Sequence, residues 1–153
     1  MRKEFVMRGR TDSGQTETLN FSGYKPGYAY RLKSIELYPM TPSGNETILA
    51  SITAGKTAVD PDVINFQNEG IIATAIQSYS TAAVDGEIKH SIVDDTFLIT
   101  QNLILMVTSM TSSEPVNWQC RFESVKMSGA EEAVEQMLVR IVLAVVSYNC
   151  VLQ

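Results

Sequence analysis

Short runs of alternating hydrophobic and polar residues follow one another along the chain from Glu4 to Met127, with clusters of turn-forming residues between them. Almost no helical periodicity interrupts the series. Short runs at regular spacing with turn signals between them are typical of an all-β sandwich or barrel. We interpret as strands the runs over residues 4–8, 16–21, 30–38, 47–53, 71–79, 88–92, 96–100, 103–110 and 118–122.

The last run has the cleanest alternation. Trp118, Cys120 and Phe122 are hydrophobic, and the residues that alternate with them are polar. Because successive side chains of a strand point to opposite faces, this pattern predicts one core face and one solvated face. The run over 103–110 is nearly all apolar, which predicts a central strand buried on both faces.

Two irregularities bear on the topology. Leu32 lies on one phase of the run over 30–38, whereas Ile35 and Leu37 lie on the other, which predicts a β-bulge near residues 33–34. The connection over 54–70 is long, and connections of that length usually cross a sandwich edge or make an interface. The order of the runs and of the long loops favours an antiparallel β-sandwich of jelly-roll or Greek-key type.

The chain changes character after Met127, so we expect a β-sandwich domain over 1–127 and an apolar extension over 128–153. Residues 128–131 fit a capping box, which predicts that a helix starts there. The run over 141–146 is wholly apolar, but a membrane span needs about 20 apolar residues, so we expect no membrane span. The extension is either a helix or added strand docked on the domain, or a tail buried in a neighbouring subunit.

Composition narrows the classes of function. The chain has 153 residues, enough for one domain with its own core, and 19% of them are charged. A net charge of −5 argues against direct nucleic-acid binding, which needs clustered Lys and Arg. Cys120 and Cys150 are too few for a disulfide scaffold, and the alternation makes Cys120 a small core residue. Residues 1–10 lack the apolar core of a secretory signal, so we expect a protein that is made and kept in a reducing compartment or is exported by lysis.

No run of residues carries a catalytic signature, and we predict that the chain is not an enzyme. Residues 55–57 read Gly-Lys-Thr, but Ala50 stands where a phosphate-binding loop requires glycine. His90 is the only histidine in the sequence, and no Gly-x-Ser-x-Gly elbow presents a nucleophile to it. One histidine and two scattered cysteines also lack the spacing of a zinc site.

Four aspartates stand in predicted turns: Asp60, Asp62, Asp94 and Asp95. Calcium prefers several oxygen ligands, so these carboxylates are candidate ligands if the fold gathers them. Their spacing matches no calcium loop, and aspartate in a turn more often accepts a hydrogen bond from the local backbone. We therefore predict no cofactor, and calcium binding by these residues stays an open hypothesis.

Tyrosines concentrate in one region of the chain, at Tyr24, Tyr28, Tyr30 and Tyr38. Their rings are suited to stacking on a sugar, or to packing at an edge or interface while the hydroxyl bonds to water or a partner. Two of them join the apolar extension as candidate interface residues. The full set is Tyr24, Tyr28, Ile141, Val142, Val145 and Val146.

The run over 28–38, the connection over 54–70 and the alternating strand over 118–122 resemble small single-jelly-roll capsid and capsid-decorating proteins of viruses, phages in particular. The resemblance is architectural and covers residues 4–127. It implies a virion structural protein, a capsid, penton or decoration subunit, that is made in the host cytoplasm and has no catalytic residues. It also implies homo-oligomers that contact other capsid subunits through loops and a terminal arm.

The alternative function is a carbohydrate-binding or adhesive β-sandwich module, whose partner is a glycan. The tyrosines and Trp118 would supply stacking surfaces, and the aspartates would supply calcium ligands. Trp118 lies on the inward phase of its strand, however, which predicts a core role for the indole. Fold alone does not separate these functions, because one sandwich architecture hosts many.

Overall fold

The computed structural model describes residues 3–21, 27–41, 45–55, 57–68, 70–79 and 87–127. Within these ranges the chain forms eight strands, and every strand pair is antiparallel. They are β1 (Lys3–Thr11), β2 (Thr16–Leu19), β3 (Tyr28–Pro39), β4 (Glu46–Thr53), β5 (Ile71–Tyr79), β6 (Glu87–Val93), β7 (Leu103–Ser109) and β8 (Val116–Lys126). The predicted C-terminal helix or strand lies outside the described residues.

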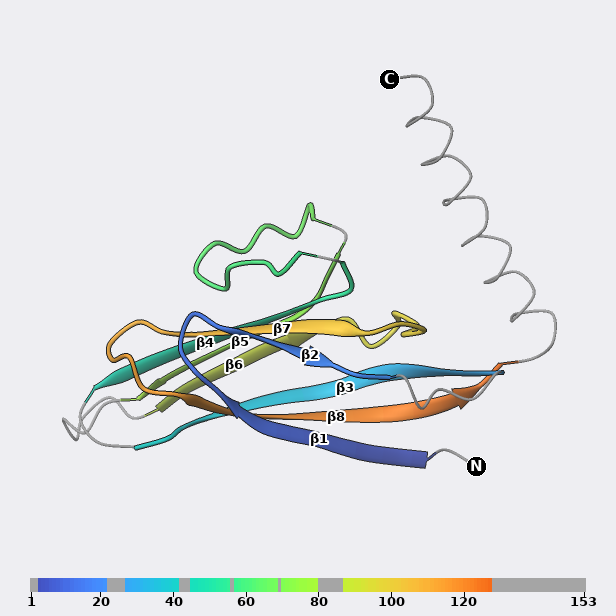
Figure 1. The fold of residues 1–153 in the computed structure, drawn as a ribbon, viewed down its shortest axis with the longest axis horizontal. Coiled ribbons are helices and arrows are strands. Elements are labelled where there is room, and N and C mark those ends of the chain that lie inside the picture. Colours follow the sequence, from blue (N-terminus) through green and yellow to red (C-terminus); the bar gives the residue numbers. More distant parts are fainter. Residues whose placement is uncertain are drawn as a thin grey trace, which may run out of the picture.

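The strands form two sheets that pack as a sandwich, which confirms the predicted fold class (Figure 1). The three-stranded sheet has the order β1-β8-β3, and the five-stranded sheet has the order β2-β7-β4-β5-β6. The pairs β1–β8, β2–β7 and β4–β5 are nested within one another, as in a jelly roll. A complete jelly roll pairs the sixth strand with the third, whereas here β6 pairs with β5. The three-stranded sheet therefore lacks a fourth strand beside β3.

The free edge of β3 is covered at one point by the connection between β6 and β7. Tyr30 and Ile99 exchange two backbone hydrogen bonds, with N···O distances of 3.0 and 2.7 Å. Ile99 is fully buried, but its neighbours in the chain do not continue the ladder. The prediction of a strand over 96–100 is therefore wrong, because the chain turns at residues 95–96 and only Ile99 pairs.

The predicted bulge in β3 is confirmed. The register between β3 and β8 shifts between Leu32 and Ser34, which leaves Lys33 as the extra residue. Leu32, Ile35 and Leu37 are all buried, although they lie on opposite phases of the sequence. The bulge thus allows both halves of a long strand to turn hydrophobic side chains into the same core.

The inward face of β8 forms the centre of the core, as the alternation predicts. Trp118, Cys120 and Phe122 are buried, and the Trp118 Nε1 donates a hydrogen bond to the Thr11 Oγ1 at 2.9 Å. Phe122 also belongs to an aromatic cluster at one end of the sandwich, whose ring centroids lie 5.1–5.6 Å apart. The members of this cluster are Phe5, Phe21, Tyr30 and Phe122.

The connection after β4 folds back over the outer face of the five-stranded sheet (Figure 1). Ser51 and Thr53 point outward from β4, yet both are buried, because their hydroxyls donate to the backbone carbonyls of Val59 and Thr57. β4 is thus buried on both faces. The prediction of a central strand over 103–110 is confirmed, because β7 lies between β2 and β4. The prediction that both faces of this strand are buried is wrong, because its outward-facing residues, such as Met106, are only half-buried.

Gly9 gives the first testable prediction. It lies opposite Trp118 in the β1–β8 ladder, and a Cβ atom at Gly9 would lie 2.8 Å from the Trp118 Cζ2. We expect Gly9→Ala to destabilise the fold by about 1–3 kcal/mol through overpacking, as measured by urea unfolding. Trp118→Phe removes the ring atoms that clash, so Gly9→Ala should cost less in that background. An equal cost in both backgrounds would contradict this account of the contact.

Cys120 gives the second prediction. Burial raises the pKa of its thiol to about 12, so almost none of the reactive thiolate forms in the folded protein. In a Cys150→Ser variant, we expect a thiol reagent at mildly alkaline pH to label Cys120 only as fast as the protein opens. Denaturant should accelerate the labelling. Labelling of the folded variant at the rate of a free thiol would show that Cys120 is accessible.

Candidate functional site

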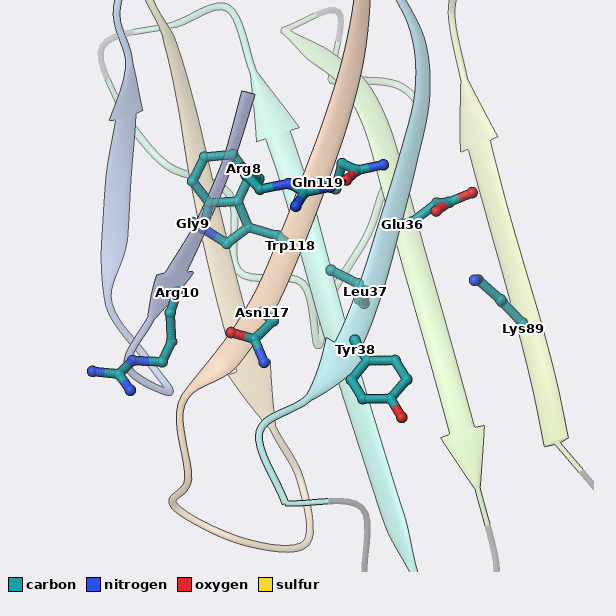
Figure 2. A pocket seen from close by; sticks show the side chains of 10 residues that line it. All are labelled: Arg8, Gly9, Arg10, Glu36, Leu37, Tyr38, Lys89, Asn117, Trp118 and Gln119. Carbon is teal, nitrogen blue, oxygen red and sulfur yellow. Dashed lines mark hydrogen bonds between the residues drawn. The ribbon is translucent and has the colours of Figure 1, made fainter. Parts of the chain in front are cut away.

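A shallow cleft of about 540 Å³ lies over the three-stranded sheet (Figure 2). The strand register places its outward-pointing side chains in two cross-strand rows. These rows are Arg8, Gln119 and Glu36, followed by Arg10, Asn117 and Tyr38. Lys89 reaches the same cleft from β6, across the edge of β3 where a fourth strand is missing. The incomplete sheet therefore opens the cleft on its β3 side.

Positive charge exceeds negative charge in this cleft. Arg8, Arg10 and Lys89 line it, against a single carboxylate from Glu36. Among the described residues, no ion pair joins any of these three cations to a carboxylate. Arg8 instead donates to the Gln119 side-chain carbonyl, and the Arg10 Nη1 lies 3.8 Å from the Met40 sulfur. Guanidinium groups without a carboxylate partner are suited to binding an anionic group.

The described tyrosines do not form one stacking platform. Tyr30 packs against Phe5 and Phe21 inside the aromatic cluster, whereas Tyr38 is 59% exposed in the cleft. Tyr28 is half-buried at the start of β3, opposite Lys126, and lies roughly 33 Å along the strand from Tyr38. One exposed aromatic ring therefore remains at the cleft.

A second surface lies on the outer face of the five-stranded sheet. Ile76, Ile88 and Ile92 point outward from β5 and β6, and Val63 and Phe66 are 73% and 60% exposed on the connection that covers the sheet. Phe66 and Ile92 line a common depression of about 410 Å³, so the loop and the strand contribute to one surface. We call these five residues the apolar patch. Exposed apolar groups of this kind mark interaction surfaces.

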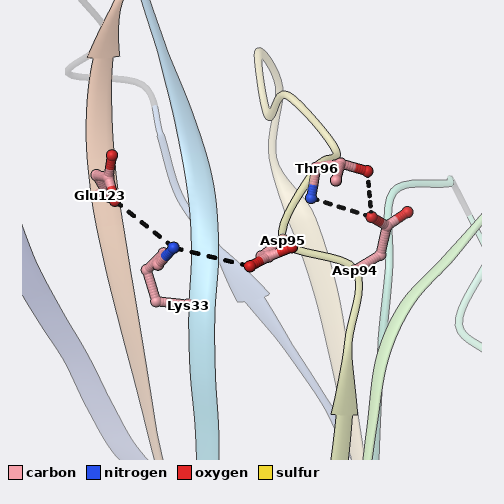
Figure 3. Close-up of polar contacts among 5 residues, drawn as sticks. All are labelled: Lys33, Asp94, Asp95, Thr96 and Glu123. Atoms are coloured by element: carbon pink, nitrogen blue, oxygen red, sulfur yellow. Dashed lines mark hydrogen bonds and ion pairs between the residues drawn. The ribbon is translucent and has the colours of Figure 1, made fainter.

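The turn after β6 is held by hydrogen bonds and ion pairs (Figure 3). The Thr96 hydroxyl donates to the Asp94 Oδ1 at 2.6 Å, and chiefly through this bond lowers the pKa of Asp94. Lys33, the bulged residue, lies 3.8 Å from Asp95 and 3.7 Å from Glu123. Lys33 thus connects β8 to the turn across the edge of β3. Because folding lowers the pKa of Asp94, its ionised carboxylate stabilises the folded protein at neutral pH. This contribution to stability is lost as the pH falls through the pKa that Asp94 has in the folded protein.

A buried carboxylate anchors the loop between β7 and β8. Glu46 is 6% exposed and accepts hydrogen bonds from the Ser112 Oγ at 2.9 Å and the Ser109 Oγ at 3.4 Å. The Thr111 hydroxyl accepts a hydrogen bond from the Thr47 amide at 3.1 Å. These contacts fix the start of β4 to the end of β7, which is a structural role.

The structure does not gather the aspartates considered for calcium. Asp60 and Asp62 lie on the connection over the five-stranded sheet, whereas Asp94 and Asp95 lie in the turn after β6. The described residues contain no group of three or more His, Cys, Asp or Glu side chains that could hold a metal ion. His90 is exposed on the outer face of β6, opposite Ile76.

Most of the predicted interface residues lie outside the described residues, namely Tyr24, Ile141, Val142, Val145 and Val146. Tyr28 is described, but it does not line the cleft or belong to the apolar patch. Sequence reasoning missed Arg8 and Arg10, whose shared outward phase was the available signal. It also missed Val63 and Phe66, two large apolar residues that are exposed on the connection over 54–70.

No protein-family model matches this chain, and a search of curated proteins finds no match. Within the described part of the chain, no helix has the length and apolar character needed to cross a membrane.

Proposed function

We propose that this chain is a virion structural protein, a capsid, penton or decoration subunit that forms homo-oligomers and contacts other capsid subunits. The jelly-roll strand order supports this proposal, because such sandwiches assemble through their loops and outer faces. The protein then acts in the virion by making contacts. It binds no cofactor and performs no reaction.

The apolar patch carries the proposal. Phe66 and Val63 expose most of their side chains, whereas Val59 and Ile64, the other large apolar residues of the same connection, are half-buried. Ile92 and Ile88 add exposed apolar area on an adjacent edge strand, which in a monomer would invite pairing with other chains. Such a surface is stable in water when another subunit covers it.

Removing apolar groups from the patch gives the third prediction. We expect the full chain to form a defined oligomer in size-exclusion chromatography with light scattering. The double substitution Phe66→Ser and Ile92→Thr should shift the protein toward monomers, because less apolar area is buried on association. Threonine suits an exposed strand position, so circular dichroism should show an unchanged β signal.

Met110→Ser is the matched control, because Met110 is 62% exposed but lies outside the patch. This variant should assemble as the unchanged chain does. A full chain that stays monomeric at every concentration would contradict the proposed function. An oligomer that is unaffected by the double substitution would show that the patch is not its interface.

A carbohydrate-binding module is the second candidate function. Tyr38 is exposed beside Asn117 and Gln119 in the cleft, and rings flanked by amides are suited to holding a sugar. Trp118 is 6% exposed, so its indole offers little stacking surface. This candidate requires a saccharide that binds the monomer, and a glycan screen on the assembly-deficient double variant tests it.

A further inference from the structure

We propose that the cleft over β1, β8 and β3 receives the loop over residues 57–68 of a second copy of the chain. The contact places Asp60 and Asp62 of one copy against Arg8 and Arg10 of the next. This inference rests on the proposed function of self-assembly and names one contact that contributes to it. Figure 1 shows the loop beyond the five-stranded sheet, with β1, β8 and β3 on the other side of the sandwich. The cleft is lined by the outward residues of these three strands, so one chain carries both halves of the contact.

The loop is already ordered by its own hydrogen bonds. The Asp60 Oδ1 accepts from the Asp62 amide at 2.9 Å, and the Asn65 Oδ1 accepts from the Gln67 amide at 3.0 Å. Ser51 and Thr53 fix the start of the loop to β4. A preformed loop loses little conformational freedom when it binds, which favours association.

The loop and the cleft are complementary in charge and polarity. The loop presents exposed carboxylates on Asp60 and Asp62 directly beside the exposed Val63 side chain. The cleft presents cations that have no carboxylate partner among the described residues, beside the exposed ring of Tyr38. A chain with a net charge of −5 repels its copies at long range, so a local attraction of this kind also selects the orientation.

The geometry of the contact determines the kind of assembly. Two different surfaces meet, so the interface is heterologous and each copy can bind one neighbour on each side. Heterologous contacts produce a ring where the rotation closes and an open array where it does not. We therefore expect assemblies with more than two copies.

Charge reversal tests the contact. The cleft variant carries Arg8→Glu and Arg10→Glu. The loop variant carries Asp62→Lys and Asp60→Asn, because asparagine keeps the Oδ1 acceptor that orders the loop. Each variant alone brings like charges together, which should raise the concentration at half-assembly about tenfold or more. A chain with all four substitutions restores opposite charges and should assemble again. An equal mixture of the two double variants should also assemble. The negative cleft of one variant meets the positive loop of the other, and the unchanged cleft meets the unchanged loop.

Lys3→Glu with Lys126→Glu is the matched control for the cleft variant. Both lysines are exposed near the other end of the three-stranded sheet, and their reversal changes the net charge by the same amount. This control should assemble as the unchanged chain does. Circular dichroism of each variant checks that the fold is retained.

The outcomes separate this inference from the proposed function. A wild-type chain that never assembles overturns both. Assembly that is unaffected by either double variant overturns the contact and leaves the proposed function standing. Loss of assembly that neither the four-substitution chain nor the mixture restores shows that the loop and the cleft do not meet. Weakening by the cleft variant alone shows that the cleft contacts a part of the neighbouring copy other than this loop, and also overturns the contact.

Cysteine crosslinking gives a second, independent readout. Chains with Arg10→Cys and chains with Asp62→Cys, both in a Cys150→Ser background, are mixed and treated with a short bis-maleimide crosslinker, because the Cα atoms of an Arg–Asp ion pair lie farther apart than a disulfide spans. The contact predicts a covalent dimer that contains one chain of each kind. Failure of this dimer to form in a mixture that still assembles overturns the contact.

Discussion

β8 is the central strand of the three-stranded sheet and holds it together, because it pairs with β1 on one side and with β3 on the other. The inward side chains of β8 form the centre of the core, and its outward side chains Asn117 and Gln119 form the floor of the cleft. The contact between Trp118 and Gly9 shows how closely the two roles are linked. The indole occupies the space that a side chain on β1 would need, and the same stretch of β1 carries Arg8 and Arg10 outward. Core packing thereby positions the cationic groups of the candidate site.

The unequal size of the two sheets produces the candidate surfaces. β6 pairs with β5, so the three-stranded sheet is one strand short and β3 has a free edge. Ile99 and Lys33 cover the first half of that edge, whereas the second half borders the cleft. The extra strand widens the other sheet and adds Ile88 and Ile92 to its outer face. A jelly roll with one displaced strand therefore gains a polar cleft on one side and an apolar patch on the other.

Local alternation in the sequence was enough to predict the core face of β8 and the bulge at Lys33, because both follow from the period of two along a single strand. It was not enough to predict that the outer face of β4 is covered by the loop that follows it. Ser51 and Thr53 read as polar residues, and their burial depends on carbonyl groups of the connection that follows. Local alternation did not predict the cleft either, since the cleft is formed by Arg8, Tyr38 and Gln119, which lie on strands that are far apart in the chain. The strand order of the sheet brings these residues together, and a local sequence pattern does not predict that order.

If the loop over 57–68 of one copy docks on the cleft of the next, the loop and the strands of the cleft become buried when the chain assembles. Hydrogen–deuterium exchange of the full chain, measured below and above the concentration of assembly, tests this most directly. We expect slower exchange in the assembled protein for amides of the loop and for the cleft segments of β1 and β3, with little change in β2. Assemblies whose loop amides exchange as fast as in the monomer would contradict the account, as would a chain that remains monomeric throughout.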